Sequence, residues 1–220
     1  LPPARAREFF DLILCGHVNE IQVGAALALI AARGPTIDEL AAGVAAMRAH
    51  VIPVALPASI LPEDAGGPAV IDTCGTGGAP KTFNISTAAA IVAAAAAPGR
   101  VLVAKHGGRS RSGRGSAEVL AALGVNVDAS PVQQTRCLEL AGVCFSFAVN
   151  HHPAMKHAAA PRKSLGFPTI FNLLGPMCNP AAASRQLVGT WNPRNAQLIA
   201  STLAWLGTRR ALVVTSDDGF

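Results

Sequence analysis

A glycine-rich segment at residues 72–87, DTCGTGGAPKTFNIST, lies between a short apolar run and a long alanine-rich run. Glycine lets the backbone approach a ligand closely and direct successive N–H groups toward it. The segment follows an expected strand and precedes the N-terminus of an expected helix, a position that favours anions. We therefore interpret it as a phosphate-binding loop. The alternative is a tight turn followed by a helix cap, and the spacing matches neither a Walker A loop nor a dinucleotide-binding fingerprint.

A second segment, KHGGRSRSGRGS at residues 105–116, combines four cations with four glycines directly after another expected strand. Ligands of parallel α/β sheets bind at the carboxyl ends of the strands, where both segments belong. Two anion-binding loops at one sheet edge fit a ligand with phosphates at both ends. The alternative is a solvated basic loop that touches nucleic acid, although it lacks the interleaved aromatic residues that stack on bases.

The surrounding pattern predicts the elements that must position these loops. The first fifty residues favour helices: Asn19 is suited to cap a helix over 20–33, and Thr36 with Glu39 has the spacing of a capping box. A proline- and glycine-rich linker at 53–68 follows. Beyond it, short apolar runs predict strands at 70–71, 101–104, 143–147, 187–191 and 211–214. Helices are expected to start at Asn84 or Ser86, to cover 116–123, and to start at Pro131 behind a Ser130 cap. This alternation predicts an α/β fold with a mainly parallel sheet covered on both faces.

The bulk composition is compatible with a packed enzyme domain. Half of the residues are hydrophobic and 14% are charged, which excludes a disordered chain. The net charge of +5 fits an acidic small molecule or nucleic acid without choosing between them. The five cysteines form no Cys-x-x-Cys pair, so neither a disulfide framework nor a zinc site is expected. The apolar run at 88–97 is too short to cross a bilayer, and no signal peptide opens the chain, so we expect a cytoplasmic protein. Because the first residue is Leu, we expect a trimmed or incomplete N-terminus.

The ordered motifs at 75–87, 105–127, 152–157, 169–176 and 179–180 resemble the anthranilate phosphoribosyltransferase family, with similarity over nearly the whole chain. The resemblance implies a helical domain at 1–66, on which helices near 153–175 pack back. It also implies an α/β domain at 67–220, of the nucleoside phosphorylase and phosphoribosyltransferase type and incomplete at its C-terminus. The implied activity is transfer of the phosphoribosyl group of phosphoribosyl pyrophosphate (PRPP) to the amine of anthranilate in tryptophan biosynthesis. The implied cofactor is Mg²⁺, and the implied assembly is a homodimer.

The resemblance also assigns residues to the two substrates. The PRPP-binding residues would be Gly75, Thr76, Gly77, Gly78, Thr82, Asn84, Ile85, Ser86, Thr87, Lys105, His106, Gly107, Gly108, Arg109, Ser110, Arg111, Ser112 and Gly113. The anthranilate-binding residues would be Gly75, His106, Gly108, His152, Arg162, Gly175 and Pro176, with Arg162 meeting the carboxylate. Ser86 would bind Mg²⁺. No residue is assigned as a catalytic nucleophile, acid or base.

The chain departs from the family pattern at several positions. Ala79 replaces a usual Asp, and Gly108 replaces a usual Asn. The family has an acidic Asp-Glu pair just beyond the turn at 217–220, where this sequence stops, so we expect a truncated chain. Two other readings stay open: a pyrimidine nucleoside phosphorylase, whose phosphate signatures are missing, and a non-catalytic relative that binds nucleic acid through the basic loop. A metal site at His151, His152 and His157 has poor spacing.

Overall fold

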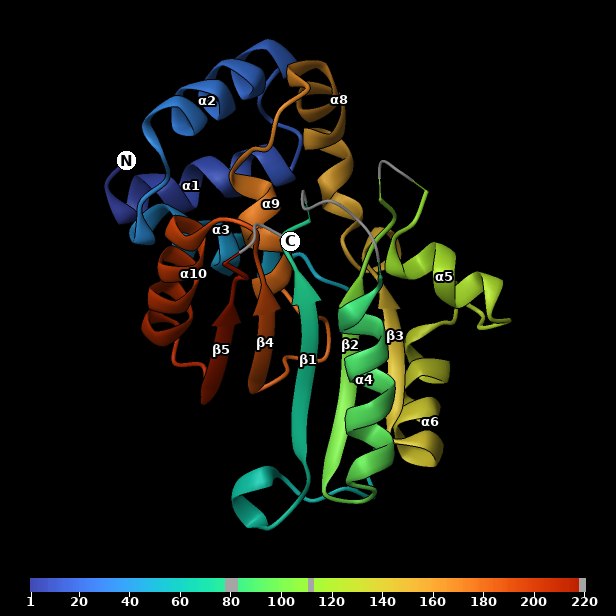
Figure 1. Cartoon of the computed structure of the whole chain (residues 1–220). Helices are drawn as coiled ribbons and strands as arrows, with labels where there is room; N and C mark the ends of the chain where they lie inside the picture. The colour runs from blue at the N-terminus through green and yellow to red at the C-terminus, as the bar shows by residue number, and fades with distance from the viewer. Residues whose placement is uncertain (78–82, 111–112, 218–220) are drawn as a thin grey trace.

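The structure is a computed structural model that describes residues 1–77, 83–110 and 113–217. Its centre is a five-stranded sheet in the order β3-β2-β1-β4-β5, in which all neighbouring strands are parallel (Figure 1). The strands are β1 (Ala69–Gly75), β2 (Val101–Gly107), β3 (Val143–Phe147), β4 (Arg185–Gly189) and β5 (Arg210–Val214). The predicted α/β class with a parallel sheet is confirmed.

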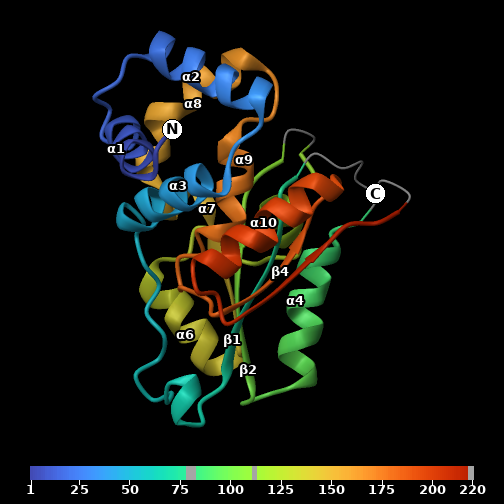
Figure 2. The same cartoon turned by 90° about the vertical axis from the view of Figure 1, so that its left-hand side faces the viewer.

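Helices surround the sheet and also form a separate layer beyond its carboxyl edge (Figures 1 and 2). The N-terminal helices are α1 (Pro3–Leu14), α2 (Glu20–Arg33) and α3 (Ile37–Ala49). The helices of the sheet region are η1 (Glu63–Ala65), α4 (Ile85–Ala96), α5 (Ser116–Ala122), α6 (Pro131–Ala141), α7 (Ala148–His151) and α10 (Pro193–Trp205). The remaining ones, which follow α7, are η2 (Pro153–Met155), α8 (Lys156–Leu165), α9 (Ile170–Leu174) and η3 (Gly175–Met177).

The helix starts follow from local hydrogen bonding. The Asn19 side chain accepts a hydrogen bond from the Gln22 N–H at 2.9 Å, which satisfies a backbone donor that has no partner within α2. Thr36 and Glu39 form the expected capping box at α3. Ser130 forms a second box at α6, in front of a proline that suits the first helical position. All three predicted caps are confirmed.

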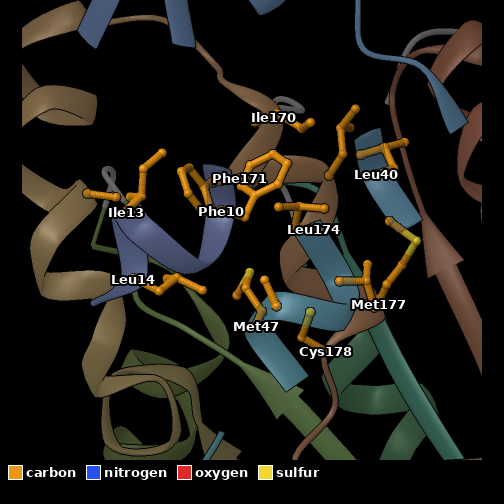
Figure 3. Close-up of a cluster of buried hydrophobic side chains, with 14 of the residues drawn as sticks. Phe10, Ile13, Leu14, Leu40, Met47, Ile170, Phe171, Leu174, Met177 and Cys178 are labelled. Carbon is orange, nitrogen blue, oxygen red and sulfur yellow. The ribbon is translucent and has the colours of Figure 1, made fainter. Parts of the chain in front are cut away.

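The helices that follow the third strand return to the N-terminal helices. α8 packs against α2, and α9 packs against α3. Phe10 of α1 and Phe171 of α9 meet edge to face, with ring centroids 6.0 Å apart. Figure 3 shows these rings within the buried cluster that joins the layers, whose labelled members also include Leu40, Met47, Leu174 and Met177. The sequence segments 3–49 and 156–174 thus share one hydrophobic core. The domain boundary between residues 66 and 67 stays a prediction.

We expected helices to cover both faces of the sheet, but one face of β5 is exposed. α4 packs on one face, against β1 and β2, and α6 packs on the opposite face, against β3 (Figure 2). α10 packs on β5, with Val213 turned toward the core that contains Ile199. Leu212 and Val214, which alternate with Val213, remain 58% and 48% exposed. No described element packs on the outer face of β5, so this face is exposed.

Three predicted strands differ from the structure by more than one residue at their ends. The strand predicted at 101–104 extends to Gly107, because the residues after Ala104 pair with β3. The strand predicted at 70–71 extends to Gly75, because the polar residues from Asp72 onward pair with β4. The strand predicted at 187–191 instead spans Arg185–Gly189, since Asn192 and Pro193 already start α10. No described helix is long and apolar enough to cross a membrane.

Candidate functional site

Both glycine-rich segments follow strands at the carboxyl edge of the sheet, on the side that faces the layer of α1, α2 and α8 (Figure 1). The first leaves β1 at Gly75 and the second leaves β2 at Gly107. Four predicted PRPP-binding residues lie outside the described residues: Gly78, Thr82, Arg111 and Ser112. Ala79 also lies outside them.

The first loop is held against β4 where it leaves the sheet. The Thr76 N–H donates to the Gly189 carbonyl at 3.0 Å, and the Thr76 and Thr190 hydroxyls are 3.3 Å apart. A Cβ atom on Gly75 would lie 3.2 Å from the Gly189 carbonyl oxygen, so the close approach favours glycine there. Gly77 has a φ of +70°, in the left-handed region that side chains disfavour. Two of the predicted glycines are thus explained by backbone geometry.

The two loops are joined at the start of α4. Asn84 precedes α4, but its side chain does not cap this helix. Its Nδ2 group donates instead to the Gly115 carbonyl of the second loop at 3.1 Å. The first-turn amides of α4 are therefore not capped by this side chain, which suits an anion at the helix N-terminus. Thr87 in the same turn is 4% exposed, and its hydroxyl has no hydrogen-bond partner.

Lys105 is buried, with 3% of its surface exposed. Its Nζ donates to the Thr73 carbonyl at 2.7 Å and to the Ser86 hydroxyl at 3.1 Å. Burial lowers the pKa of Lys105, while the negative charge of Asp72 opposes that shift. The predicted residues Lys105 and Ser86 are thus brought together directly.

His106 and His152 form a buried pair next to the second loop. Their ring centroids are 5.1 Å apart, and the Nε2 atom of each has no hydrogen-bond partner. Burial, followed by repulsion from neighbouring histidines, lowers the pKa of His106 to about 3. Burial likewise lowers the pKa of His152 to about 4. Both rings are neutral at pH 7 and offer polar edges without adding charge.

The second loop is packed tightly at its start and more openly afterwards. A Cβ atom on Gly107 would lie 2.3 Å from the Ser116 hydroxyl and 3.0 Å from the Phe145 ring, so both side chains would have to shift, and the packing favours glycine. A Cβ atom on Gly108 would meet only the Ala148 Cβ, at 3.9 Å. Arg109 lies over the Phe147 ring, 5.6 Å from its centroid. Gly113 has a φ of +68°. At least one cation of this basic loop, Arg109, packs on the protein, so the loop is not wholly solvated.

Three of the predicted anthranilate-binding residues lie on α8 and η3, namely Arg162, Gly175 and Pro176. The Arg162 guanidinium lies 5.4 Å from the centroid of the Phe171 ring, so an aromatic face orients it. The Pro176 carbonyl accepts a hydrogen bond from Gln186 Nε2 at 2.7 Å, which fixes η3 to β4. A backbone hydrogen bond at Gly175 raises the pKa of His106 against the effect of burial. A surface hollow of about 400 Å³ lies elsewhere, along α1 around Arg7 and Asp11. Its open, exposed lining contains none of the predicted residues, so we place the site by its chemistry.

Sequence reasoning assigned no role to Asp72. This residue is 0% exposed, and its Oδ1 atom accepts the His106 backbone N–H at 2.9 Å. Burial raises the pKa of Asp72, and the His106 hydrogen bond opposes that rise. The available signal was a carboxylate placed directly after the apolar run at 69–71. Its partner could not be read from the sequence because it lies on another strand.

The fit of Mg²⁺ depends on Ser86. A hydroxyl oxygen is a suitable hard ligand for this ion, which usually keeps several waters and binds substrate phosphates. Ser86 alone is one ligand, and the Lys105 ammonium group already donates to it. The described residues contain no group of three or more His, Cys, Asp or Glu side chains placed to hold a metal ion. Most ligands at this point would therefore have to come from the substrate and water.

Two family models match the chain. The α/β domain of a glycosyl transferase family matches residues 67–220, and the helical bundle domain of the same family matches residues 1–51. The chain belongs to this glycosyl transferase family. Among curated members, the anthranilate phosphoribosyltransferases of Methylococcus capsulatus and Moorella thermoacetica are 47% and 45% identical to it over its whole length. The chain spans 61% and 62% of these two family members.

Solved structures of the family agree with this assignment. The anthranilate phosphoribosyltransferase of Thermus thermophilus matches with a TM-score of 0.88 and 38% identity, over 99% of this chain and 63% of that one. The Saccharomyces cerevisiae enzyme in complex with PRPP and Mg matches with a TM-score of 0.85 and 25% identity, over 100% of this chain and 62% of that one. The family fold predicted from the motifs is confirmed.

Proposed function

We propose that the protein containing this sequence is an anthranilate phosphoribosyltransferase that transfers the phosphoribosyl group of PRPP to the amine of anthranilate. The observation that carries the proposal is the joining of two glycine-rich loops at one sheet edge. Asn84 bonds to Gly115, and Lys105 bonds to Ser86, so the loops form one polar surface next to a helix N-terminus. The similarity to anthranilate phosphoribosyltransferases supports this reading over a nucleoside phosphorylase.

The reaction breaks the bond between C1 of the ribose and the pyrophosphate oxygen, and the pyrophosphate leaves with the electron pair. The anthranilate nitrogen donates its lone pair to C1 and releases one proton to water. An aromatic amine is neutral at pH 7, so no strong base is required. The loop amides stabilise the charge that develops on the leaving group. Arg162 holds the anthranilate carboxylate, and positioning supplies much of the rate.

Further parts of the proposal concern the cofactor and the assembly. Ser86 would be one ligand of Mg²⁺, which stabilises negative charge on phosphoryl oxygens when it is bound. The substrates are PRPP and anthranilate, the assembly is a homodimer, and the location is cytoplasmic. The division into a helical domain at 1–66 and an α/β domain at 67–220 belongs to the same proposal.

Anthranilate fluorescence provides the test. The chain, and a chain extended past Phe220, are each mixed with anthranilate, PRPP and Mg²⁺, and loss of fluorescence is followed against a control without PRPP. PRPP-dependent loss with the extended chain is the expected result, and loss with the extended chain alone would separate the effect of truncation from a different function. No loss, together with binding to duplex DNA that weakens steeply with salt, would favour the nucleic-acid reading instead.

A further inference from the structure

The two central strands separate before they reach the carboxyl edge of the sheet. β1 and β2 are paired from Ala69 with Val101 to Ile71 with Val103. Beyond this point β1 pairs with β4, and β2 pairs with β3. A split therefore opens between β1 and β2, and it ends between the two glycine-rich loops.

Three of the backbone groups that face this split bond to side chains instead of to the opposite strand. Successive residues in a parallel strand direct their backbone groups to alternate neighbours. The Val103 N–H bonds to the Gly142 carbonyl next to β3, so the backbone groups of Ala104 and His106 face β1. The Ala69 N–H bonds to the Arg100 carbonyl next to β2, so the Thr73 carbonyl also faces the split.

Three side chains replace the missing ladder bonds. Asn179 Nδ2 donates to the Ala104 carbonyl at 2.7 Å. The Asp72 carboxylate accepts the His106 N–H at 2.9 Å, and Lys105 Nζ donates to the Thr73 carbonyl at 2.7 Å. All three side chains are more than nine-tenths buried. A buried backbone group without a hydrogen-bond partner lowers the stability of the fold, so each of these groups needs a side-chain partner where the strands separate.

Two of these three side chains also connect the gap between β1 and β2 to the two glycine-rich loops. Asp72 and Lys105 carry opposite charges on the two separating strands. Lys105 reaches Ser86 at the start of α4, and Asp72 holds the backbone at the first residues of the second loop. Asp72 is not one of the predicted ligand-binding residues, but it bonds to the backbone of His106, which is one of them, and it acts through that residue.

We infer that Asp72 is a positioning residue: its carboxylate on β1 accepts the His106 N–H of β2 where the two strands separate, and so fixes the second loop relative to the first. This inference rests on the proposed function only where PRPP affinity is concerned. The separation of the strands and the His106 bond can be tested without a ligand.

Three variants separate this role from general stability. Asp72→Asn keeps an acceptor oxygen for the His106 N–H, whereas Asp72→Leu has similar bulk and no acceptor. Ser146→Ala is the matched control. Ser146 is 0% exposed and pairs in register with His106, but its hydroxyl bonds to Gln134 at 2.7 Å, away from the split. Hydrogen exchange of residues 103–110 and calorimetric titration with PRPP and Mg²⁺ are measured on each, with Tm as the index of folding.

Asp72→Leu should exchange faster at 103–110 and bind PRPP more weakly by about tenfold or more, since small misplacements of a site are costly. Asp72→Asn should keep near-wild-type exchange at 103–110, because it keeps the acceptor for the His106 N–H, and Ser146→Ala should lower Tm alone. Wild-type exchange and affinity in Asp72→Leu would overturn the inference, as would an Asp72→Asn variant that exchanges as fast as Asp72→Leu. If Asp72→Leu does not fold, Asp72→Ala takes its place with the same outcomes. If the wild-type chain binds no PRPP, the proposed function fails, and the exchange result still decides the role of Asp72.

Discussion

The Lys105 ammonium group donates a hydrogen bond of 3.1 Å to the Ser86 hydroxyl, so the second glycine-rich segment reaches directly into the first. The same group also donates to the Thr73 carbonyl. Two of its three N–H donors are thus used within the protein. Lys105 therefore connects β1 to the start of α4 from a buried position.

Replacement of Lys105 by methionine should weaken PRPP binding by about tenfold or more, because Ser86 and the Thr73 carbonyl lose a shared donor. The unfolding free energy should fall by about 1–3 kcal/mol from the unsatisfied carbonyl. Calorimetric titration and urea unfolding measure the two effects. Lys163→Met, on the exposed surface of α8, is the control that should change neither. Unchanged PRPP affinity in Lys105→Met would contradict this role.

Replacement of Arg162 by alanine should weaken anthranilate binding by about 1.5–3 kcal/mol, the range for a charged hydrogen bond, and leave PRPP binding nearly unchanged. The Arg162 guanidinium lies over the Phe171 ring, 5.4 Å from its centroid, and the prediction is that its N–H groups bind the anthranilate carboxylate. Arg162→Lys keeps the charge and should restore part of the affinity. Anthranilate fluorescence titration reports the effect. Equal weakening of both substrates would show that Arg162 is not the carboxylate ligand.

Replacement by alanine should destabilise the protein at Gly107 but not at Gly108, the next glycine of the second loop. Gly107→Ala places a Cβ 2.3 Å from the Ser116 hydroxyl and 3.0 Å from Phe145, so stability should fall by about 1–3 kcal/mol. Gly108→Ala and Gly108→Asn have room beside Ala148 and should fold normally. Since the resemblance described in the sequence analysis implies Asn at this position, we expect Gly108→Asn to bind anthranilate at least as tightly as wild type. A lower Tm for Gly108→Ala than for Gly107→Ala would refute the packing argument.

The buried histidines should make the chain sensitive to mild acid. The pKa of His152 falls from 6.5 to about 4 through burial, so below pH 6.5 the unfolded state binds a proton that the folded state excludes. The stabilisation is complete above pH 6.5 and is lost as the pH falls toward 4. One such group contributes a slope of up to about 1.4 kcal/mol per pH unit.

Urea unfolding at pH 7.5, 6 and 5 tests this point. His152→Asn should show a shallower loss of stability between pH 6.5 and 5 than the wild type. His17→Asn, a change in an exposed histidine, should keep the wild-type slope. Parallel pH profiles for wild type and His152→Asn would show that His152 does not carry the effect.

Local signals in the sequence predicted local features well. Asn19, Thr36 and Ser130 start helices as expected, because a cap depends on residues within one helical turn. The strand at 143–147 was also located correctly. The order of the strands and the return of α8 and α9 to the N-terminal helices depend on contacts far apart in sequence. Only the family resemblance anticipated that return.

The candidate site was only partly predictable for the same reason. Glycine spacing identified both loops, and the structure explains Gly75, Gly77 and Gly107 by close approach or positive φ. The roles of Asp72 and Lys105 inside the sheet could not be read from their neighbours, because they arise where β1 and β2 separate. A polar residue after an apolar strand indicates a special position without naming its partner.

Calorimetric titration of the chain with PRPP in the presence of Mg²⁺ decides whether the two loops form one PRPP site. We expect saturable binding of one PRPP per chain that inorganic pyrophosphate displaces and that Lys105→Met weakens while Lys163→Met does not. Absence of PRPP binding by the folded chain, or binding that both variants leave unchanged, would show that the two loops do not form this site.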